Sequence, residues 1–192
     1  TPCDVTSQYQ DGSFTYNIRR ADDRTSPTHL NLFRFVFPDF KTIEILFCDK
    51  PTGSWATGVR WVFFNGEAIW LEGPAKEWFE PQTRETIRRC YRILRKHRDA
   101  FTSSQPIPLV PTEMGGLFAN AFAAADRTVY TLYNSRHRTV RGPVLRVPHA
   151  EGISCYDEWH QRSASVERDG QDTLICLQLG PMGVGCVVVK PE

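Results

Sequence analysis

The sequence predicts an α/β region followed by an all-β region, and three observations support this division. Before about residue 105, apolar runs alternate with helical patterns. After it, short alternating segments are separated by Gly, Pro and Asn. Between the two, Ser103–Pro108 is rich in Ser and Pro, which favour a break between folded parts. We therefore expect two domains, residues 1–104 and residues 105–192.

Composition and charge exclude several classes of protein. The 192 residues include 23 basic and 22 acidic side chains, so no overall field attracts nucleic acid or an anionic membrane. The chain has no run of about 18 apolar residues, so no membrane-spanning helix is expected. The six cysteines form no C-x-x-C pair, and no histidine pair has zinc spacing. We expect scattered buried thiols, no metal site and no cofactor, and cysteine usage assigns no compartment.

Three helices are expected in the first region. The clearest spans residues 81–101, where Ile87, Cys90, Tyr91, Leu94 and Phe101 recur on one side and Pro81 suits the first turn. A second begins at Ser26-Pro27 and continues to Val36, with apolar residues almost all round, which indicates burial. A third spans residues 54–64 and ends at Asn65-Gly66, a typical left-handed cap.

The opposite side of the 81–101 helix is strongly basic, which raises the question of nucleic acid binding. Its cations are Arg84, Arg88, Arg89, Arg92, Arg95, Lys96 and Arg98. Because the total charge is nearly neutral and no aromatic residues accompany them, we interpret this side as a solvated surface.

Two short buried strands lie between these helices. Residues 42–47 and 67–72 are apolar runs bounded by chain breakers, with Gly73-Pro74 after the second. The order is helix, strand, helix, strand, helix. Apolar strands joined by helices predict a parallel sheet that is covered on both faces.

The second region predicts an antiparallel β-sandwich. Five strands are expected, at residues 117–122, 128–133, 142–147, 173–179 and 183–189. Gly180-Pro181 is expected to join the last two, and Asp169-Gly170 marks another hairpin. Many short strands at this spacing are typical of a sandwich.

Several stretches resemble a known enzyme group. Val62-Phe63-Phe64-Asn65-Gly66-Glu67, followed by the helix ending Leu94-Arg95-Lys96-His97-Arg98-Asp99-Ala100-Phe101, resembles the closing part of large glycoside hydrolase barrels. Thr128–Asn134, with Arg138-Thr139-Val140-Arg141-Gly142, resembles the β-sandwich that follows such barrels. The group is the α-glycosidase-like enzymes, which include α-galactosidases and α-glucosidases. The resemblance covers most of the chain.

The resemblance implies a partial (β/α) barrel end followed by an antiparallel β-sandwich. Residues 42–47 and 67–72 correspond to the seventh and eighth barrel strands, and Cys3-Asp4 to the end of the sixth. The earlier strands are not in the sequence, including the fourth, which carries the nucleophile in these enzymes. The remainder of the barrel is then expected as missing N-terminal sequence or as another chain; a smaller layered fold is the other possibility.

The catalytic candidate is Asp4. Retaining glycosidases use two carboxylates about 5–5.5 Å apart, and barrel enzymes hold such groups at the carboxyl ends of strands. The resemblance implies that Asp4 is the acid/base, whose proton requires partial burial or a neighbouring negative charge. The alternative is a loop aspartate that caps a turn.

Five further residues are candidates for substrate binding at the same edge: Asp11, Asp49, Trp55, Glu72 and Trp78. Carboxylates can bind sugar hydroxyls, and a Trp face can stack on a pyranose ring. Each also has a structural interpretation. Asp11 lies in a turn signal, Asp49 can cap a helix, Glu72 can pair with Lys76, and Trp side chains fill cores.

The predicted function is that of a glycoside hydrolase fragment acting on a carbohydrate substrate, with an accessory sandwich. The alternative is a non-catalytic module, either structural or carbohydrate-binding. In the binding version, aromatic residues of the sandwich form a sugar platform: Tyr130, Tyr133, Tyr156 and Trp159.

Overall fold

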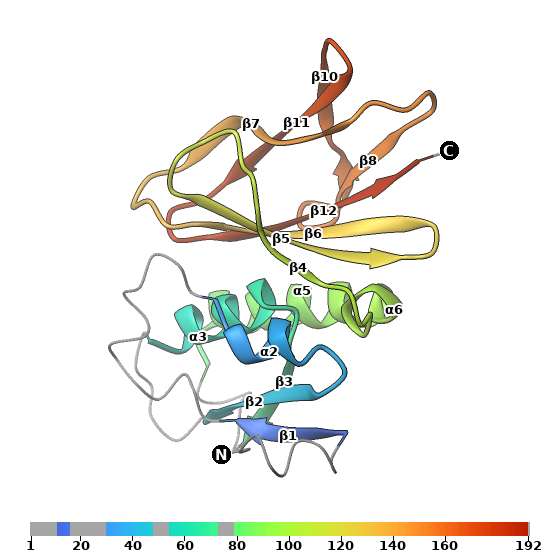
Figure 1. The fold of residues 1–192 in the computed structure, drawn as a ribbon. Coiled ribbons are helices and arrows are strands. Elements are labelled where there is room, and N and C mark those ends of the chain that lie inside the picture. The colour runs from blue at the N-terminus through green and yellow to red at the C-terminus, as the bar shows by residue number, and fades with distance from the viewer. Residues whose placement is uncertain (1–10, 16–29, 48–53, 73–78, 192) are drawn as a thin grey trace. The chain divides into compact units, whose positions relative to one another are not determined.

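A computed structural model describes residues 11–15, 30–47, 54–72 and 79–191 (Figure 1). The chain divides into two compact units, Thr1–Ser104 and Gln105–Glu192. Unit 1 contains one parallel sheet with helices, and unit 2 contains two antiparallel sheets. The predicted order, an α/β part followed by an all-β sandwich, is therefore confirmed.

The sheet of unit 1 has three strands in the order β1-β2-β3. They are β1 Gly12–Thr15, β2 Lys41–Phe47 and β3 Ala68–Glu72. Both neighbouring pairs are parallel, and the register runs from Ile43 opposite Ala68 to Phe47 opposite Glu72. The two segments predicted as buried strands are thus parallel neighbours, as expected.

Strand β1 was not predicted, because Asp11, Gly12 and Ser13 read locally as a turn. Tertiary pairing overrides that signal: Lys41 donates its backbone N–H to the Asp11 carbonyl at 2.9 Å, and Gly12 lies opposite Lys41. A Cβ atom added to Gly12 would lie 2.5 Å from the Lys41 carbonyl oxygen. Gly12 therefore allows the backbones of β1 and β2 to approach closely, and it does not form a turn.

Helices α3 (Ser54–Phe64), α5 (Pro81–Lys96) and α6 (Arg98–Phe101) follow the predicted pattern. The expected 81–101 helix is interrupted at His97, whose φ and ψ of −115° and 33° are not helical. The inward side of α5 buries Thr83, Ile87, Cys90 and Ile93. Its arginines are exposed or half-buried, which agrees with a mostly solvated outer side.

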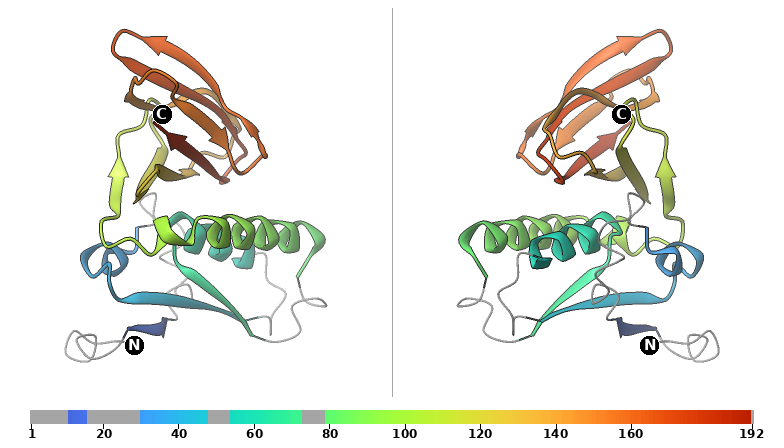
Figure 2. Two further views of the ribbon diagram at one scale, coloured as in Figure 1. Left: turned by 90° about the vertical axis from the view of Figure 1, so that its right-hand side faces the viewer. Right: turned by 90° about the vertical axis from the view of Figure 1, so that its left-hand side faces the viewer.

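The expectation that helices cover both faces of the sheet does not hold for the described residues. Helices α3 and α5 lie on the same face (Figures 1 and 2), and Ile69 of β3 is buried. On alternate positions of β3, Ala68 is exposed and Trp70 is 47% exposed. Coverage on one face is the arrangement found in a barrel wall, where helices form only the outer layer.

The predicted helix at 26–36 is also different. Helix α2 is Leu32–Val36, residues 30 and 31 are not helical, and residues 16–29 lie outside the described part. Leu32 and Val36 are 66% and 63% exposed, whereas Arg34 is 1% exposed. The helix therefore turns its cation inward, because Arg34 donates to the Phe101 carbonyl at 2.6 Å.

A buried carboxylate connects α2 to both longer strands. Glu67, 1% exposed, precedes β3 and accepts hydrogen bonds from the Asn31 side-chain amide and the Thr42 hydroxyl. The Asn31 backbone N–H donates in turn to the Asn65 side-chain oxygen at 2.8 Å. Asn31 thus uses its side chain on Glu67 and makes no side-chain cap for α2. This buried carboxylate, with Asn31, Thr42 and Asn65, is named the Glu67 cluster.

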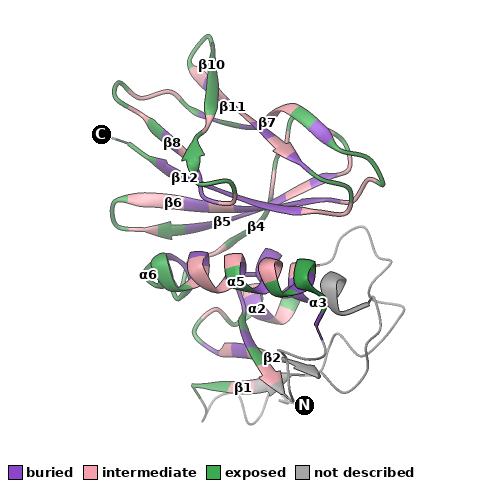
Figure 3. Ribbon diagram, turned by 180° about the vertical axis from the view of Figure 1, so that it is seen from behind, coloured by how far each residue is buried: buried purple, intermediate pink, exposed green. Residues whose placement is uncertain are grey.

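Unit 2 is a sandwich of two antiparallel sheets, with strand orders β4-β5-β6-β12-β8-β9 and β10-β11-β7. The first sheet comprises β4 Ile107–Val110, β5 Leu117–Ala124, β6 Arg127–Asn134, β12 Val184–Lys190, β8 Ser154–Asp157 and β9 Arg162–Ser163. The second comprises β10 Ser165–Asp169, β11 Asp172–Leu179 and β7 Val140–Pro148. Figure 3 shows β12 buried and β10 exposed.

All five predicted sandwich strands are confirmed, as is the hairpin at Asp169-Gly170, where Asp169 pairs with Asp172. The Gly180-Pro181 turn is also present, and it carries the chain from one sheet to the other. Four strands were not predicted: β4, β8, β9 and β10. They have two to five residues, and β9 and β10 are wholly exposed, so no apolar alternation marks them.

The sandwich core is formed by the facing sides of the two sheets. It contains Leu117, Ala119, Leu132, Val140, Val144, Leu145, Val147, Cys155, Ile175, Leu177, Leu179, Val187 and Val189. These branched and aliphatic side chains come from alternate positions of the longer strands, which is the pattern that a two-sheet core requires. Of the four cysteines in the described residues, all are free thiols and three are buried.

Asn134 closes one end of the sandwich. It is fully buried, and its amide donates to the carbonyls of Arg138 at 2.9 Å and Gly180 at 2.8 Å. Its side-chain oxygen accepts from the Arg136 backbone N–H at 3.0 Å. One side chain therefore connects the loop after β6 to the turn between β11 and β12.

The Glu67 cluster predicts a large stability effect. Replacing Glu67 with Ala leaves the buried Asn31 and Thr42 donors without their acceptor, so we expect the free energy of unfolding to fall by about 3 kcal/mol. Glu67→Gln, which keeps one acceptor oxygen, should lose less. Urea denaturation followed by circular dichroism measures both, with the exposed Glu80→Ala as the control; equal stability of the Ala variant and the wild type contradicts the prediction.

Asn134 predicts a second effect, confined to unit 2. Asn134→Ala removes four hydrogen bonds inside the protein, and we expect it to lower the free energy of unfolding by about 2 kcal/mol. The exposed Gln171→Ala should change this free energy by no more than about 0.5 kcal/mol. Thermal unfolding of the two variants gives the comparison, and equal midpoints would show that water replaces the lost partners.

Candidate functional site

Three of the six residues predicted for the site lie within the described residues, and three do not. Asp4, Asp49 and Trp78 are outside them. Trp55 is the second residue of α3 and Glu72 the last residue of β3, and only their backbone is described. Asp11 alone is described with its side chain, which is exposed.

The carboxyl ends of β2 and β3 lie side by side, because their last residues, Phe47 and Glu72, are register partners. In the sequence, Asp49 follows β2 by two residues and Trp78 follows β3 by six. Parallel strands bring the segments that follow them to one edge of the sheet. The edge at which β2 and β3 end is named the carboxyl edge.

Asp11 lies at the opposite edge. It comes immediately before β1, so the positional argument that placed it at the carboxyl end of a strand does not apply. The strand beside β2 also begins at Gly12, whereas the prediction expected one that ends at Cys3-Asp4. The binding role of Asp11 and the catalytic role of Asp4 both stay predictions.

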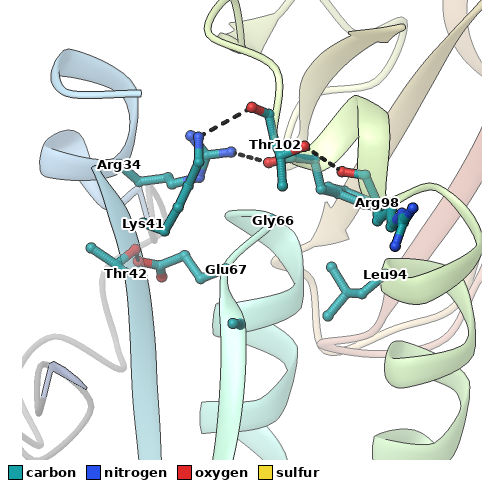
Figure 4. Close-up of a pocket in the computed structure, with 10 residues that line it drawn as sticks. Arg34, Lys41, Thr42, Gly66, Glu67, Leu94, Arg98 and Thr102 are labelled. Carbon is teal, nitrogen blue, oxygen red and sulfur yellow. Dashed lines mark hydrogen bonds between the residues drawn. The ribbon is translucent and has the colours of Figure 1, made fainter. Parts of the chain in front are cut away.

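A pocket of about 160 Å³ lies at the amino edge of the sheet, next to the Glu67 cluster (Figure 4). Its lining combines three cations with apolar groups: Arg34, Lys41, Thr42, Gly66, Glu67, Ala68, Leu94, Arg98, Phe101 and Thr102. Figure 4 shows Arg34 and Lys41 reaching toward the chain at Thr102, while Thr42 and Glu67 lie together below them. All these groups belong to unit 1.

Two of the three cations, Arg34 and Lys41, are held by carbonyls at the end of α6. Lys41 donates its ammonium to the Thr102 carbonyl at 3.1 Å and to the Pro38 carbonyl at 2.5 Å, and Arg34 binds the Phe101 carbonyl. Burial, together with the neighbouring Arg34 charge, lowers the pKa of Lys41. Burial lowers the pKa of Arg34 as well, and the Glu67 carboxylate opposes this shift. Cations near the carboxyl end of a helix stabilise it.

The polar groups of the amino-edge pocket therefore hold α2, β2 and the end of α6 together. Polar groups at this edge of a parallel barrel sheet serve stability, whereas catalytic groups lie at the other edge. Sequence analysis assigned Glu67 to a strand and gave it no role, since nothing local distinguishes a buried acid from an exposed one. The described residues contain no cluster of three or more side chains suited to a metal ion.

The aromatic platform considered for the sandwich is not one surface. Tyr133 is 4% exposed, and Tyr130, on the opposite face of β6, packs against the sandwich core. Alternation along a strand directs such neighbours at odd spacing to opposite faces. Tyr130 and Tyr133 therefore do not belong to one platform, and the carbohydrate-binding alternative stays a prediction. Within the described part of the chain, no helix has the length and apolarity that crossing a membrane requires.

The chain matches no protein-family model and no curated protein sequence. It is similar in fold to solved structures of carbohydrate-acting enzymes. An α-amylase from H. orenii has 11% identity and a TM-score of 0.59, over 97% of this chain and 51% of that one. An Anoxybacillus α-amylase has 10% identity and a TM-score of 0.60, over 98% and 50%. α-Galactosidase I from Mortierella vinacea has 12% identity and a TM-score of 0.53, over 80% and 40%.

The chain thus spans about half, or less, of the length of these structures while they cover most of it. At 10–12% identity such similarity concerns the fold alone. An α-galactosidase is among the similar structures, and it belongs to the group that the sequence resembles. The chain has the fold of a glycoside-hydrolase-like C-terminal region.

Proposed function

We propose that this chain is part of a glycoside hydrolase and that it contributes one wall of a carbohydrate pocket. The observation that carries the proposal is the fold: parallel β/α units followed by a sandwich, matched over 97–98% of the chain by two α-amylases. Fold alone does not determine chemistry, so the specific roles below rest on residue types and their order along the chain.

The pocket in this proposal lies at the carboxyl edge. Asp49 and Glu72 supply carboxylates that accept hydrogen bonds from sugar hydroxyls. Trp55 and Trp78 supply aromatic faces that stack on pyranose rings. The adjacent ends of β2 and β3 support this grouping, because Phe47 and Glu72 are register partners.

Asp4 is the proposed acid/base, following the resemblance to the α-glycosidase-like enzymes. Strand β1 suggests a second possibility. Strand β1 ends at Thr15, and Asp22 and Asp23 follow it in the sequence. A protonated carboxyl group from one of these positions would donate to the leaving-group oxygen, and a second carboxylate would act as nucleophile or base.

The remaining barrel strands come, in this proposal, from sequence that precedes this chain in a longer protein or from another chain. Within the described residues, the three-stranded parallel sheet has helices on one face (Figure 2), whereas parallel sheets are normally covered on both faces. Unit 2 then has an accessory role and carries no catalytic group.

Hydrolysis of a series of glycosides by the whole protein, from alkyl leaving groups that need protonation to activated aryl leaving groups that do not, tests the proposal. We expect turnover by the wild type and a loss of several orders of magnitude in Asp4→Asn, because the variant cannot donate a proton. Aryl leaving groups that need no protonation should retain more activity in this variant. The same assay on Asp22→Asn and Asp23→Asn decides between the two possible positions of the acid.

Asp39→Asn is the matched control, since Asp39 is an exposed aspartate between α2 and β2, at the amino edge. It should keep wild-type turnover. Asp11→Asn tests the predicted binding role: an unchanged KM removes Asp11 from the site. If the whole protein cleaves none of a broad panel of glycosides, the hydrolase proposal fails and the structural alternative is favoured.

A further inference from the structure

An open groove of about 420 Å³ lies on unit 2, far along the chain from the candidate carboxyl edge. Its volume is within the range of about 300–1,000 Å³ that is typical of small-molecule sites. The groove is lined by Arg141, Gly142, Asp157, Arg162, Ser163, Ala164, Ser165, Glu167, Cys176, Leu177 and Gln178. These residues come from five strands and from the point where the chain crosses from β9 in one sheet to β10 in the other.

A β-bulge brings Arg141 to this groove. Along β7, Arg146 is exposed and Leu145 and Val147 are buried, as alternation requires. The pairing of β7 with β11 then shifts, since Ile175 pairs with Leu145 whereas Cys176 pairs with Pro143. The skipped residue, Val144, is buried like its neighbour Leu145.

If side chains alternated without a bulge from Leu145 onward, Arg141 would face the sandwich core. With it, Arg141 faces outward and donates to the Gln178 side-chain oxygen at 2.5 Å. Bulges that re-aim a side chain are enriched beside functional sites. The adjacent Gly142 has a φ of +124°, a conformation that side-chain-bearing residues rarely adopt, and it also lines the groove.

The opposite wall is the β8–β9 hairpin. Asp157, 2% exposed, lies opposite Arg162 and forms a 3.7 Å ion pair with it. The carboxylate is held in place by the backbone N–H of His160 at 3.1 Å and by its ring Nδ1 at 2.7 Å. The wall therefore presents a fixed carboxylate, a guanidinium and the hydroxyl of Ser163.

The charges of the groove balance: Arg141 and Arg162 are offset by Asp157 and Glu167. The lining combines guanidinium and serine donors with carboxylate and amide acceptors, and it also contains the apolar residues Ala164 and Leu177. A ligand hydroxyl both donates and accepts a hydrogen bond, so this mixture suits a neutral, polyhydroxylated molecule. A strong anion or cation would meet an equal number of like charges.

We infer that this groove binds a neutral oligosaccharide. The choice of carbohydrate as the ligand rests on the proposed function. Arg141 and Gln178 form one wall of the site, and Asp157 with Arg162 forms the other.

A glycan array probed with the fluorescently labelled whole protein tests the inference. The array carries neutral gluco-, galacto- and xylo-oligosaccharides together with sulfated and uronic-acid oligosaccharides. We expect retention on a neutral class, and titration calorimetry with that oligosaccharide then gives the Kd. Arg141→Ala and Gln178→Ala should each weaken binding about tenfold, the effect of losing one good hydrogen bond.

Arg168→Ala is the control, because Arg168 is an exposed arginine on the neighbouring strand β10 and does not line the groove. A second readout is Cys176, the groove thiol, whose hydrogen bond reaches Glu167 at 3.6 Å. Peptide mass spectrometry should show slower iodoacetamide alkylation of Cys176 when the oligosaccharide is present. The inference is overturned if only acidic glycans bind, if none bind, or if both groove variants bind like the wild type.

Failure of this inference and failure of the proposed function are distinguishable. Arg141→Ala should leave turnover of a small aryl glycoside unchanged, while Asp4→Asn should leave array binding unchanged. Turnover without array binding rejects the groove alone. Array binding that depends on Arg141, without turnover, rejects the hydrolase and keeps the groove.

Discussion

Unit 1 depends on the parallel pairing of β2 with β3. Parallel neighbours cannot be joined by a tight turn, so the chain must return through a crossover, and here the crossover is α3. The crossover helix α3 and the following helix α5 lie on the same face of the sheet (Figures 1 and 2). The same pairing creates two chemically different edges, one where strands begin and one where they end. Which role is considered for a candidate residue of unit 1 depends on whether it comes before a strand or after one.

The amino edge is occupied by a buried carboxylate and its donors. Burying Glu67 removes a charge from water, a cost that only close hydrogen bonds can offset, and Asn31 and Thr42 provide them. Arg34 and Lys41 complete the edge by binding carbonyls at the end of α6. Such a network is intolerant of losing one member, which suits a role in holding three elements together.

Unit 2 shows how a single extra residue changes a surface. Val144 is accommodated by a bulge, and every residue before it on β7 changes face relative to simple alternation. Arg141 thereby reaches Gln178 on the outside of the sheet, while Val140 joins the core. The positive φ of Gly142 accompanies this change. A groove with balanced charges results beside the β8–β9 hairpin, on a sandwich whose large aromatic side chains Tyr130 and Tyr133 are used for packing.

Local pattern determined the order of elements: β2, α3, β3, α5 and the five longer sandwich strands follow from apolar periodicity, chain breakers and caps, which act over a few residues. It also predicted the boundary near residue 105, where helical apolar patterns give way to short alternating segments. Only the tertiary structure decided that Gly12 belongs to a strand, that Arg34 and Glu67 are buried, and that Asp11 lies at the amino edge. Likewise, only strand pairing revealed the bulge that turns Arg141 outward. The physical reason is the same in each case: pairing register and buried partners are set by residues distant in the chain, which no local window contains.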